Sequence, residues 1–334
     1  SRKEIVYVGA NDGMLHAFDA DTGEELWAFI PPVMVKNITK FIAVKPNTSN
    51  AIYGVDGSIV VKDIYFDKGQ GKKWYTVLIA GQGRGGQSYF ALDITKPLAP
   101  DFLFAFENNI LDKRVYHWDG KGNRKSLSYD KKNIASEYDY SKLGETWSVP
   151  SIVPMIKNNI LRWVAVFGSG YNGGTNTTFG SSIYVIDLEN KGKVLKRIDL
   201  TDVNNNIANS VPASLVSVTP DTTSKAKYKG SMIYVADLES KKWKLNLTDK
   251  GTLYDLTPIF DGEATIENDR MEFFQITPTI GTDGNLWSYY GTGNQQSVQT
   301  VSANIKNRIF AIKDVDFPDY KSVSGLNNTA TSSL

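Results

Sequence analysis

The stretch Ile5–Phe29, IVYVGANDGMLHAFDADTGEELWAF, sets the pattern for the rest of the chain. It reads as an apolar strand, a glycine turn, a strand that ends in Phe-x-Asp, a Thr-Gly turn and a strand that ends in Trp-x-Phe. Weaker copies follow, namely TVLIAGQGRGGQSYFALDI from Thr76, WVAVFGSGYNGG with SIYVIDL from Trp163, MIYVADLESKKWKLNL from Met232, and LWSYYGTGN with NRIFAIKDV from Leu286. One β unit that recurs at this spacing predicts a repeat architecture.

A further short segment precedes each central pair of strands. These segments are YGVDGSIV at Tyr53, WSVPSIVP at Trp147, NSVPASLV at Asn209 and QITPTIGT at Gln275. Three of the four contain proline. Because proline cannot donate a ladder hydrogen bond, these prolines indicate the start of an innermost strand. No convincing amphipathic helix of three turns interrupts the series.

These units predict an all-β fold, a β-propeller of at least five and up to seven blades. Four complete blades fit residues 53–106, 147–199, 209–260 and 275–316. Residues 5–29 supply the second to fourth strands of another blade. A propeller often completes such a blade with a strand from the far end of the chain, which hides both sheet edges.

The predicted propeller occupies residues 1–316, and residues 317–334 are expected to form a C-terminal tail or linker because they are small and polar. Residues 107–146 are rich in Asn, Lys, Tyr and Asp and interrupt the blade pattern. Long loops in compact domains are uncommon and frequently functional. We therefore expect a surface insertion with some structure of its own.

The composition excludes several classes of protein. The chain has 334 residues with 37 basic and 36 acidic side chains, which argues against a nucleic-acid binder or a polybasic membrane-surface protein. No apolar run approaches about 20 residues, so no transmembrane segment is expected. The absence of cysteine excludes disulfides, thiolate metal sites and a cysteine nucleophile. The initial Ser-Arg-Lys-Glu does not read as a signal peptide, as expected of a fragment that begins inside a longer precursor.

Candidate catalytic groups are few, and we predict that the chain is not an enzyme. His16 lies between apolar neighbours and is expected to be a hydrogen-bonded structural residue, whereas His117 is expected to be exposed. The segment 81–86, GQGRGG, superficially resembles a phosphate-cradling loop. No helix or Walker lysine follows it, so a tight turn between strands is favoured. No acidic pair stands out as general acid and base.

Exposed aromatic residues are strong anchors for a protein or glycan partner. Four of five tryptophans considered for this role fall in strand motifs, which favours core packing: Trp147, Trp163, Trp243 and Trp287. The fifth, Trp118, lies in the insertion. The predicted contact surface comprises Arg114, Tyr116, Trp118 and Tyr129.

Two families share this pattern. The phrase FDADTGEELW at Phe18 resembles the Asp-x-x-Thr-Gly-x-x-x-Trp signature of quinoprotein-type propellers, which also recurs in propellers without a cofactor. The wider combination is more specific: VYVGANDGMLHAFDADTGEELWAFIPP, YGVDGSIVVKDIYF, WYTVLIAGQGRGGQSYFALDITKP, WSVPSIVP and ITPTIGTDGNLWSYYGTGN. In this order it closely resembles the C-terminal propeller domain of the PilC/PilY family, over about residues 4–315.

The resemblance implies a role in type IV pilus biogenesis in a Gram-negative bacterium. The family is exported to the periplasm, the outer membrane or the cell surface at the pilus tip. Implied partners are minor pilins, the pilus tip, the protein's own N-terminal region and host cells or surfaces. The implied effects are on adhesion, twitching motility and the balance of pilus extension against retraction, through protein binding by rigid propeller loops.

The resemblance also implies a calcium loop before Ile233, of the form Asp-x-Asp-x-Asp-Gly-x-x-Asp, because calcium takes six to eight oxygen ligands. In this chain the ligand positions fall on Thr223, Lys225, Lys227 and Ser231. Lysines would repel the ion, so we predict that this site is absent and that no cofactor is bound.

A second candidate for calcium is the run Asp202, Asn204 and Asn206. Its position twelve is Ala213 and its position six is not glycine, so an Asn-rich turn between blades is the favoured interpretation. Asp19 and Asp21 also alternate, yet the Thr-Gly turn explains them better.

Two alternative functions remain open. A quinone-cofactor dehydrogenase usually has eight blades with Trp motifs in most of them, whereas this chain has one good Trp motif. A scaffold propeller of envelope assembly is the other alternative, and the YGVDGSIV and GQGRGGQSYFALD segments favour the pilus family over it.

Overall fold

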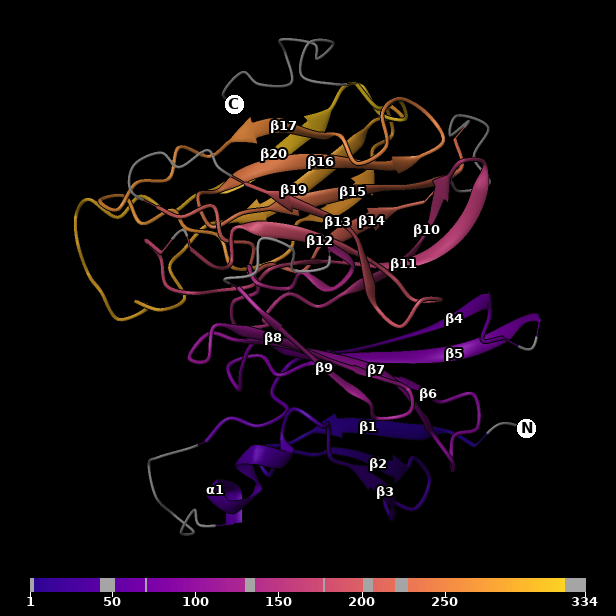
Figure 1. The fold of residues 1–334 in the computed structure, drawn as a ribbon. Helices are drawn as coiled ribbons and strands as arrows, with labels where there is room; N and C mark the ends of the chain where they lie inside the picture. The colour runs from indigo at the N-terminus through magenta and orange to yellow at the C-terminus, as the bar shows by residue number, and fades with distance from the viewer. Residues whose placement is uncertain are drawn as a thin grey trace. The chain divides into compact units, whose positions relative to one another are not determined.

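Figure 1 shows the computed structural model, which describes residues 3–42, 52–69, 71–129, 136–176, 178–200, 207–219 and 228–321. Within these residues nearly all regular structure is β-strand. The helical turns there are short: η1 (Val35–Asn37), α1 (Ile38–Ile42) and η2 (Ser136–Tyr138). The all-β prediction is confirmed. In each sheet the spatial order of the strands follows their order in the chain, because every strand pairs with the strand next to it in the sequence.

The first sheet holds β1 (Ile5–Gly9), β2 (Leu15–Asp19) and β3 (Glu25–Phe29), which pair antiparallel. They match the three strands expected for residues 5–29, including the Phe-x-Asp and Trp-x-Phe endings. Within the described ranges no further strand joins this sheet. The described residues near the C-terminus therefore do not supply the fourth strand that we expected for this sheet.

The second sheet has six strands: β4 (Ile59–Asp67), β5 (Lys72–Gly81), β6 (Ser88–Asp93), β7 (Asp101–Asn109), β8 (Arg114–Asp119) and β9 (Arg124–Ser128). Its first four strands match the blade expected at residues 53–106. β8 and β9 come from the predicted insertion and form a hairpin that extends the sheet beyond β7 (Figure 1). Asp119 Oδ1 ties the connecting turn by accepting from the Lys121 and Asn123 N–H groups, both at 3.0 Å.

Three more sheets follow. They contain β10 (Ser151–Lys157), β11 (Ile160–Gly168), β12 (Ser182–Asp187) and β13 (Lys193–Asp199); β14 (Val216–Val218), β15 (Gly230–Ala236), β16 (Lys241–Thr248) and β17 (Leu256–Asp261); and β18 (Thr277–Ile280), β19 (Leu286–Gly291) and β20 (Ile309–Asp314). The first two sheets coincide with the four-stranded blades expected at residues 147–199 and 209–260. The third lies within the blade expected at residues 275–316 but has three strands in the described residues instead of four, because the chain turns after Asp314. Pro154 and Pro278 lie in β10 and β18, which are edge strands, as the proline argument requires.

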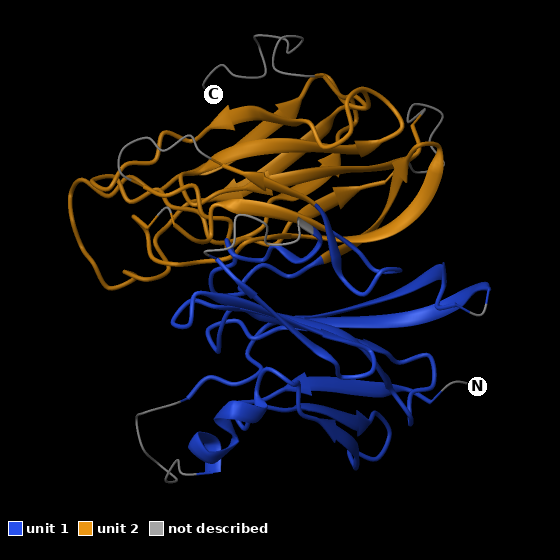
Figure 2. Cartoon of the chain, in the orientation of Figure 1, with its two compact units in different colours: residues 1–150, 186–195 blue, residues 151–185, 196–334 orange. Residues whose placement is uncertain are grey.

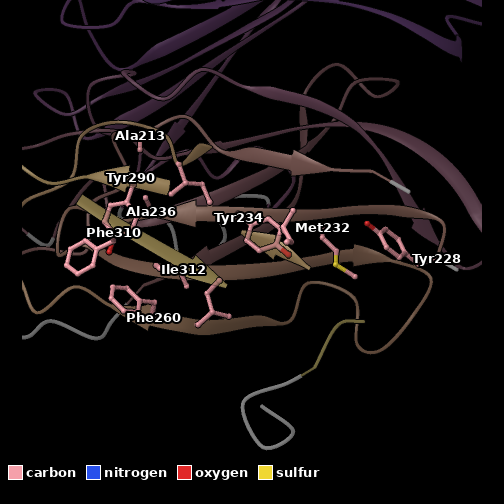
Figure 3. Packing of buried hydrophobic residues seen from close by; sticks show 12 residues of the cluster. Ala213, Tyr228, Met232, Tyr234, Ala236, Phe260, Tyr290, Phe310 and Ile312 are labelled. Atoms are coloured by element: carbon pink, nitrogen blue, oxygen red, sulfur yellow. The ribbon is translucent and has the colours of Figure 1, made fainter. Parts of the chain in front are cut away.

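The chain divides into two compact units, residues 1–150 with 186–195 and residues 151–185 with 196–334 (Figure 2). Each unit has its own apolar cluster. That of the first contains Leu15, Val33, Met34, Val55, Leu78, Ala80, Phe90, Leu92, Ile94 and Ala105. Figure 3 shows the cluster of the second unit, where the Phe310 ring centroid lies 5.2 Å from that of Phe260 and 5.0 Å from that of Tyr290.

β16 is buried along its whole length although it carries three lysines. Burying a charge is costly unless it is paired. Lys242 pairs with Glu272, and Lys244 Nζ lies 2.7 Å from Asp314 Oδ2. The motif KKWKLNL has the composition of a polar strand, but in the folded chain every residue of this strand is buried.

Candidate functional site

β8 carries most of the predicted contact surface. Successive residues of a strand point to opposite faces, so Arg114, Tyr116 and Trp118 share one face. Val115 and His117 take the other, where they are 0% and 1% exposed. The strand is thus anchored by one face and presents aromatic side chains on the other.

The expectation that His117 is exposed is wrong. Its Nε2–H donates to the Lys191 carbonyl oxygen at 2.7 Å, and its ring centroid lies 4.0 Å from that of Tyr138. Burial lowers the pKa of His117 to about 4, so the ring is neutral near pH 7. His117 lies two residues after Val115 and so shares the face of an apolar residue, which is a sequence signal for burial. The polar composition of the insertion obscured this signal.

A groove of about 600 Å³ lies beside Tyr116 and Trp118, and we call it the β8 groove. The two ring centroids are 6.0 Å apart at an interplanar angle of 47°. From β9, Arg124 places its Cζ 5.0 Å from the centroid of the Tyr116 ring. Pro32 and Val33 from the segment before η1 and Val35, the first residue of η1, line the same groove.

Charged groups border the β8 groove. Lys36 forms an ion pair with Glu107, a residue of β7. Burial raises the pKa of Glu107, and Lys36 opposes the shift. Asp112 Oδ2 accepts from Asn109 Nδ2 at 2.9 Å and from the Tyr116 hydroxyl at 3.4 Å. The groove therefore offers aromatic faces together with donors and acceptors of both charges.

Arg114 and Tyr129 are not among the residues that line the β8 groove. Arg114 Nη1 donates to Ser126 Oγ at 3.2 Å, across the β8–β9 hairpin. The Tyr129 hydroxyl donates to Asn108 Oδ1, and burial raises the pKa of Tyr129 to about 12. The structure brings Tyr116 and Trp118 together and adds Arg124, which the DGKGN turn between two strands signals in the sequence.

Lys36 had no sequence signal as a groove residue, because it lies 71 positions before its partner Glu107. Only the folded chain brings the two together. The groups of the β8 groove are suited to binding: rings stack on flat apolar surfaces, and the polar border orients what binds. Tyr116 and Trp118 are half-buried, and aromatic side chains with an adjacent arginine are typical of interface anchors.

His16 is hydrogen-bonded, as its sequence position predicts. Its Nδ1 lies 2.7 Å from Glu25 Oε1 and its Nε2 lies 2.9 Å from Asp12 Oδ2. Burial lowers the pKa of His16, but these two hydrogen bonds outweigh burial and the net pKa is raised. The ring links the β2–β3 pair to the turn before β2.

The quinoprotein-like phrase has a structural role here. Asp19 Oδ1 accepts from the Asp21 N–H at 2.9 Å, and Lys3 Nζ lies 2.5 Å from Asp19 Oδ2. Trp27 Nε1 donates to the Pro97 carbonyl oxygen at 2.8 Å, in the loop between β6 and β7. The aspartate ties its own turn, as expected, and the tryptophan bonds to a loop of the neighbouring sheet.

The calcium candidates Asp202, Asn204 and Asn206 lie outside the described residues, as do Thr223, Lys225 and Lys227 of the family loop. Ser231 is described, and its Oγ donates to the Pro154 carbonyl oxygen at 2.7 Å. In the part of the chain that the structure describes, no three acidic or histidine side chains gather as a metal site would require. The predicted lack of calcium stays a prediction.

Comparison with known proteins identifies the family. The sequence profile of the PilY1 beta-propeller domain matches residues 1–281. The chain is 32% identical over 264 residues to a type IV pilus biogenesis factor PilY1 homolog of Xylella fastidiosa, covering 74% of this chain and 14% of that protein. It is 30% identical over 249 residues to type IV pilus biogenesis factor PilY1 of Pseudomonas aeruginosa strain UCBPP-PA14, covering 74% of this chain and 17% of that protein.

The chain thus spans less than a fifth of the length of these two relatives. The crystal structure of the Pseudomonas aeruginosa PilY1 C-terminal domain has the same fold, with a TM-score of 0.61 and 22% identity over 94% of this chain and 58% of that one. The propeller prediction is confirmed. Among the described helices, none has the length and apolar character that a membrane crossing requires. The chain belongs to the PilY1 β-propeller domain family.

Proposed function

We propose that this chain is the propeller domain of a type IV pilus biogenesis factor and that it acts by binding other proteins rather than by catalysis. The observation that carries the proposal is the similarity of three quarters of the chain to relatives named for that role. In this proposal the protein is exported and works at the pilus tip or the cell surface. It binds minor pilins there and biases pilus extension against retraction, with consequences for twitching and adhesion.

The β8 groove is our proposed contact for the minor pilins. Tyr116 and Trp118 offer apolar rings, and Arg124 places a charge over one of them. Buried aromatic and arginine side chains dominate most interface energies. The hairpin that supports the groove is held by the buried His117, so the rings are presented on a fixed strand and lose little freedom on binding.

The experiment measures binding of the purified full-length protein to an immobilised, purified minor-pilin complex. We expect Trp118→Ala and Tyr116→Ala each to weaken binding about tenfold or more, which corresponds to about 1.4 kcal/mol or more. The matched control is Trp74→Ala, because Trp74 is 62% exposed on β5 and does not line the groove. Equal losses for Trp74 and Trp118, or no loss for either groove variant, would contradict the groove assignment.

The quinoprotein alternative is tested separately. We expect the purified protein to show no dye-coupled alcohol oxidation after incubation with pyrroloquinoline quinone and calcium. The Asp19 side chain accepts a hydrogen bond within its own turn, and the Trp27 side chain donates one to the loop between β6 and β7. Quinone-dependent oxidation of an alcohol would contradict the binding-protein proposal if replacing an aspartate or glutamate of this chain abolished it.

A further inference from the structure

The glycine-rich turn at residues 81–86 is held rigidly. Thr146 Oγ1 accepts from the Gln82 and Gly83 N–H groups at 2.9 and 3.2 Å. The Gly85 N–H donates to the Gln82 carbonyl at 2.8 Å. A Cβ on Gly85 would lie 2.1 Å from the Gly54 carbonyl oxygen, so only glycine allows the two backbones to approach this closely.

This turn presents Arg84 at the surface between two aromatic side chains. The Arg84 Cζ lies 5.2 Å from the Trp147 ring centroid and 5.9 Å from the Tyr53 ring centroid. Arg84 is exposed, and Tyr53 is 38% exposed. Stacking on aromatic faces orients a guanidinium and leaves the donors in its plane available.

The donors of Arg84 have no partner among the residues that the structure describes. Asp56 lies on the adjacent turn, where its N–H donates to the Gln82 carbonyl at 3.2 Å, but it forms no ion pair with Arg84. The nearby Glu145 accepts from Trp147 Nε1 at 3.0 Å. Burial raises the pKa of Glu145, and Trp147 and Arg84 oppose the shift. An oriented guanidinium with free donors is suited to receive a carboxylate.

We propose that Tyr53, Arg84 and Trp147 form a docking surface for a protein that presents an aspartate or glutamate carboxylate. A guanidinium fork binds a carboxylate through two parallel hydrogen bonds, and arginine, tyrosine and tryptophan are the residues most enriched at interface hot spots. The rigid turn limits the entropy lost on docking. This surface shares no residue with the β8 groove, and the inference does not rest on the pilin-binding proposal.

The test places the photo-cross-linking residue p-benzoylphenylalanine at Ser58, an exposed residue two positions after Asp56, in the full-length protein in living cells of the source bacterium. We expect a cross-link to a protein segment that contains aspartate or glutamate. Arg84→Glu and Arg84→Gln should each reduce the adduct at least tenfold. Arg84→Lys should reduce it severalfold, because an ammonium cannot form the two parallel bonds.

The matched control is Arg308→Glu, which makes the same charge change at another exposed arginine, in the second unit. It should leave the adduct unchanged. Replacing the partner's acidic residue by arginine should restore the adduct in the Arg84→Glu protein and not in the Arg84→Gln protein. The proposal is overturned by an adduct that persists in Arg84→Glu, by one on a saccharide or on a segment without acidic residues, or by no adduct.

Discussion

At the residue scale, the interior of this chain tolerates charge where a partner is fixed beside it. Lys242 pairs with Glu272, and its Nζ lies 3.5 Å from the centroid of the Tyr290 ring. Both members of the ion pair are 1% exposed. A buried ion pair adds little net stability, but removing one partner leaves the other as an unpaired charge without water around it. Replacing Lys242 alone should therefore change the free energy of unfolding more than replacing Lys242 and Glu272 together.

We predict that Lys242→Met lowers the free energy of unfolding by about 3–5 kcal/mol, because Glu272 loses its partner. The double variant Lys242→Met with Glu272→Leu should recover most of that loss, since neither position of the pair then holds an unpaired charge. Denaturant unfolding of the three proteins measures both effects. A double variant no more stable than the single one would show that the pair itself supplies the stability.

The buried His117 predicts a pH dependence. Its folded-state pKa of about 4 lies below the ordinary value of 6.5, so the unfolded chain binds more protons between these two values. The contribution is fully present above pH 6.5 and is lost as the pH falls toward 4, by up to about 3 kcal/mol. The difference in melting temperature between wild type and His117→Gln should therefore be largest and constant above pH 6.5 and shrink as the pH falls toward 4. A constant difference across this range would contradict a neutral buried ring.

At the element scale, the sheets share one way of ending a strand. In four of the described sheets a strand ends with an aspartate whose Oδ1 accepts from the N–H two residues on. The distances are 2.9 Å for Asp19, Asp93 and Asp187 and 3.1 Å for Asp314. Asn246 makes the same contact at 3.0 Å, but it lies two residues before the end of β16. A second shared feature is a glycine at the end of the preceding strand, as at Gly9 and Gly168.

These strand-end glycines make room for the segment that follows in the next sheet. A Cβ on Gly168 would lie 2.2 Å from the Val211 carbonyl oxygen, and one on Gly9 would lie 2.3 Å from the Val55 carbonyl oxygen. We predict that Gly168→Ala lowers the free energy of unfolding by about 1–3 kcal/mol through overpacking. Gly291→Ala is the matched control, because no atom of the described residues lies within 4 Å of the Cβ it would add. Equal urea midpoints for the two variants would contradict this account.

The sequence predicts these elements because alternation, turn chemistry and repetition all agree in residues 5–29 and their copies. It does not predict the β8 groove as a whole. The β8–β9 hairpin carries a local signal in RVYHWD followed by DGKGN, but charged residues obscure it. The pairing of Lys36 with Glu107 depends on long-range packing that leaves no mark in local periodicity.

At the scale of the whole molecule, the described residues form five sheets of one repeated β unit, joined by many loops. The formal net charge of +1 gives no broad electrostatic field to drive association, so in our proposals recognition depends on local surfaces, the β8 groove and the turn that carries Arg84. These two surfaces are where we expect partners to dock.

The most direct test of the pilus-biogenesis proposal is a count of surface pili by electron microscopy in a strain that lacks only this propeller. We predict that pili are lost when the retraction motor is active and return when retraction is also disabled. That result would assign the propeller to the balance of extension against retraction. Normal piliation in the propeller-deleted strain with retraction active would contradict the proposal.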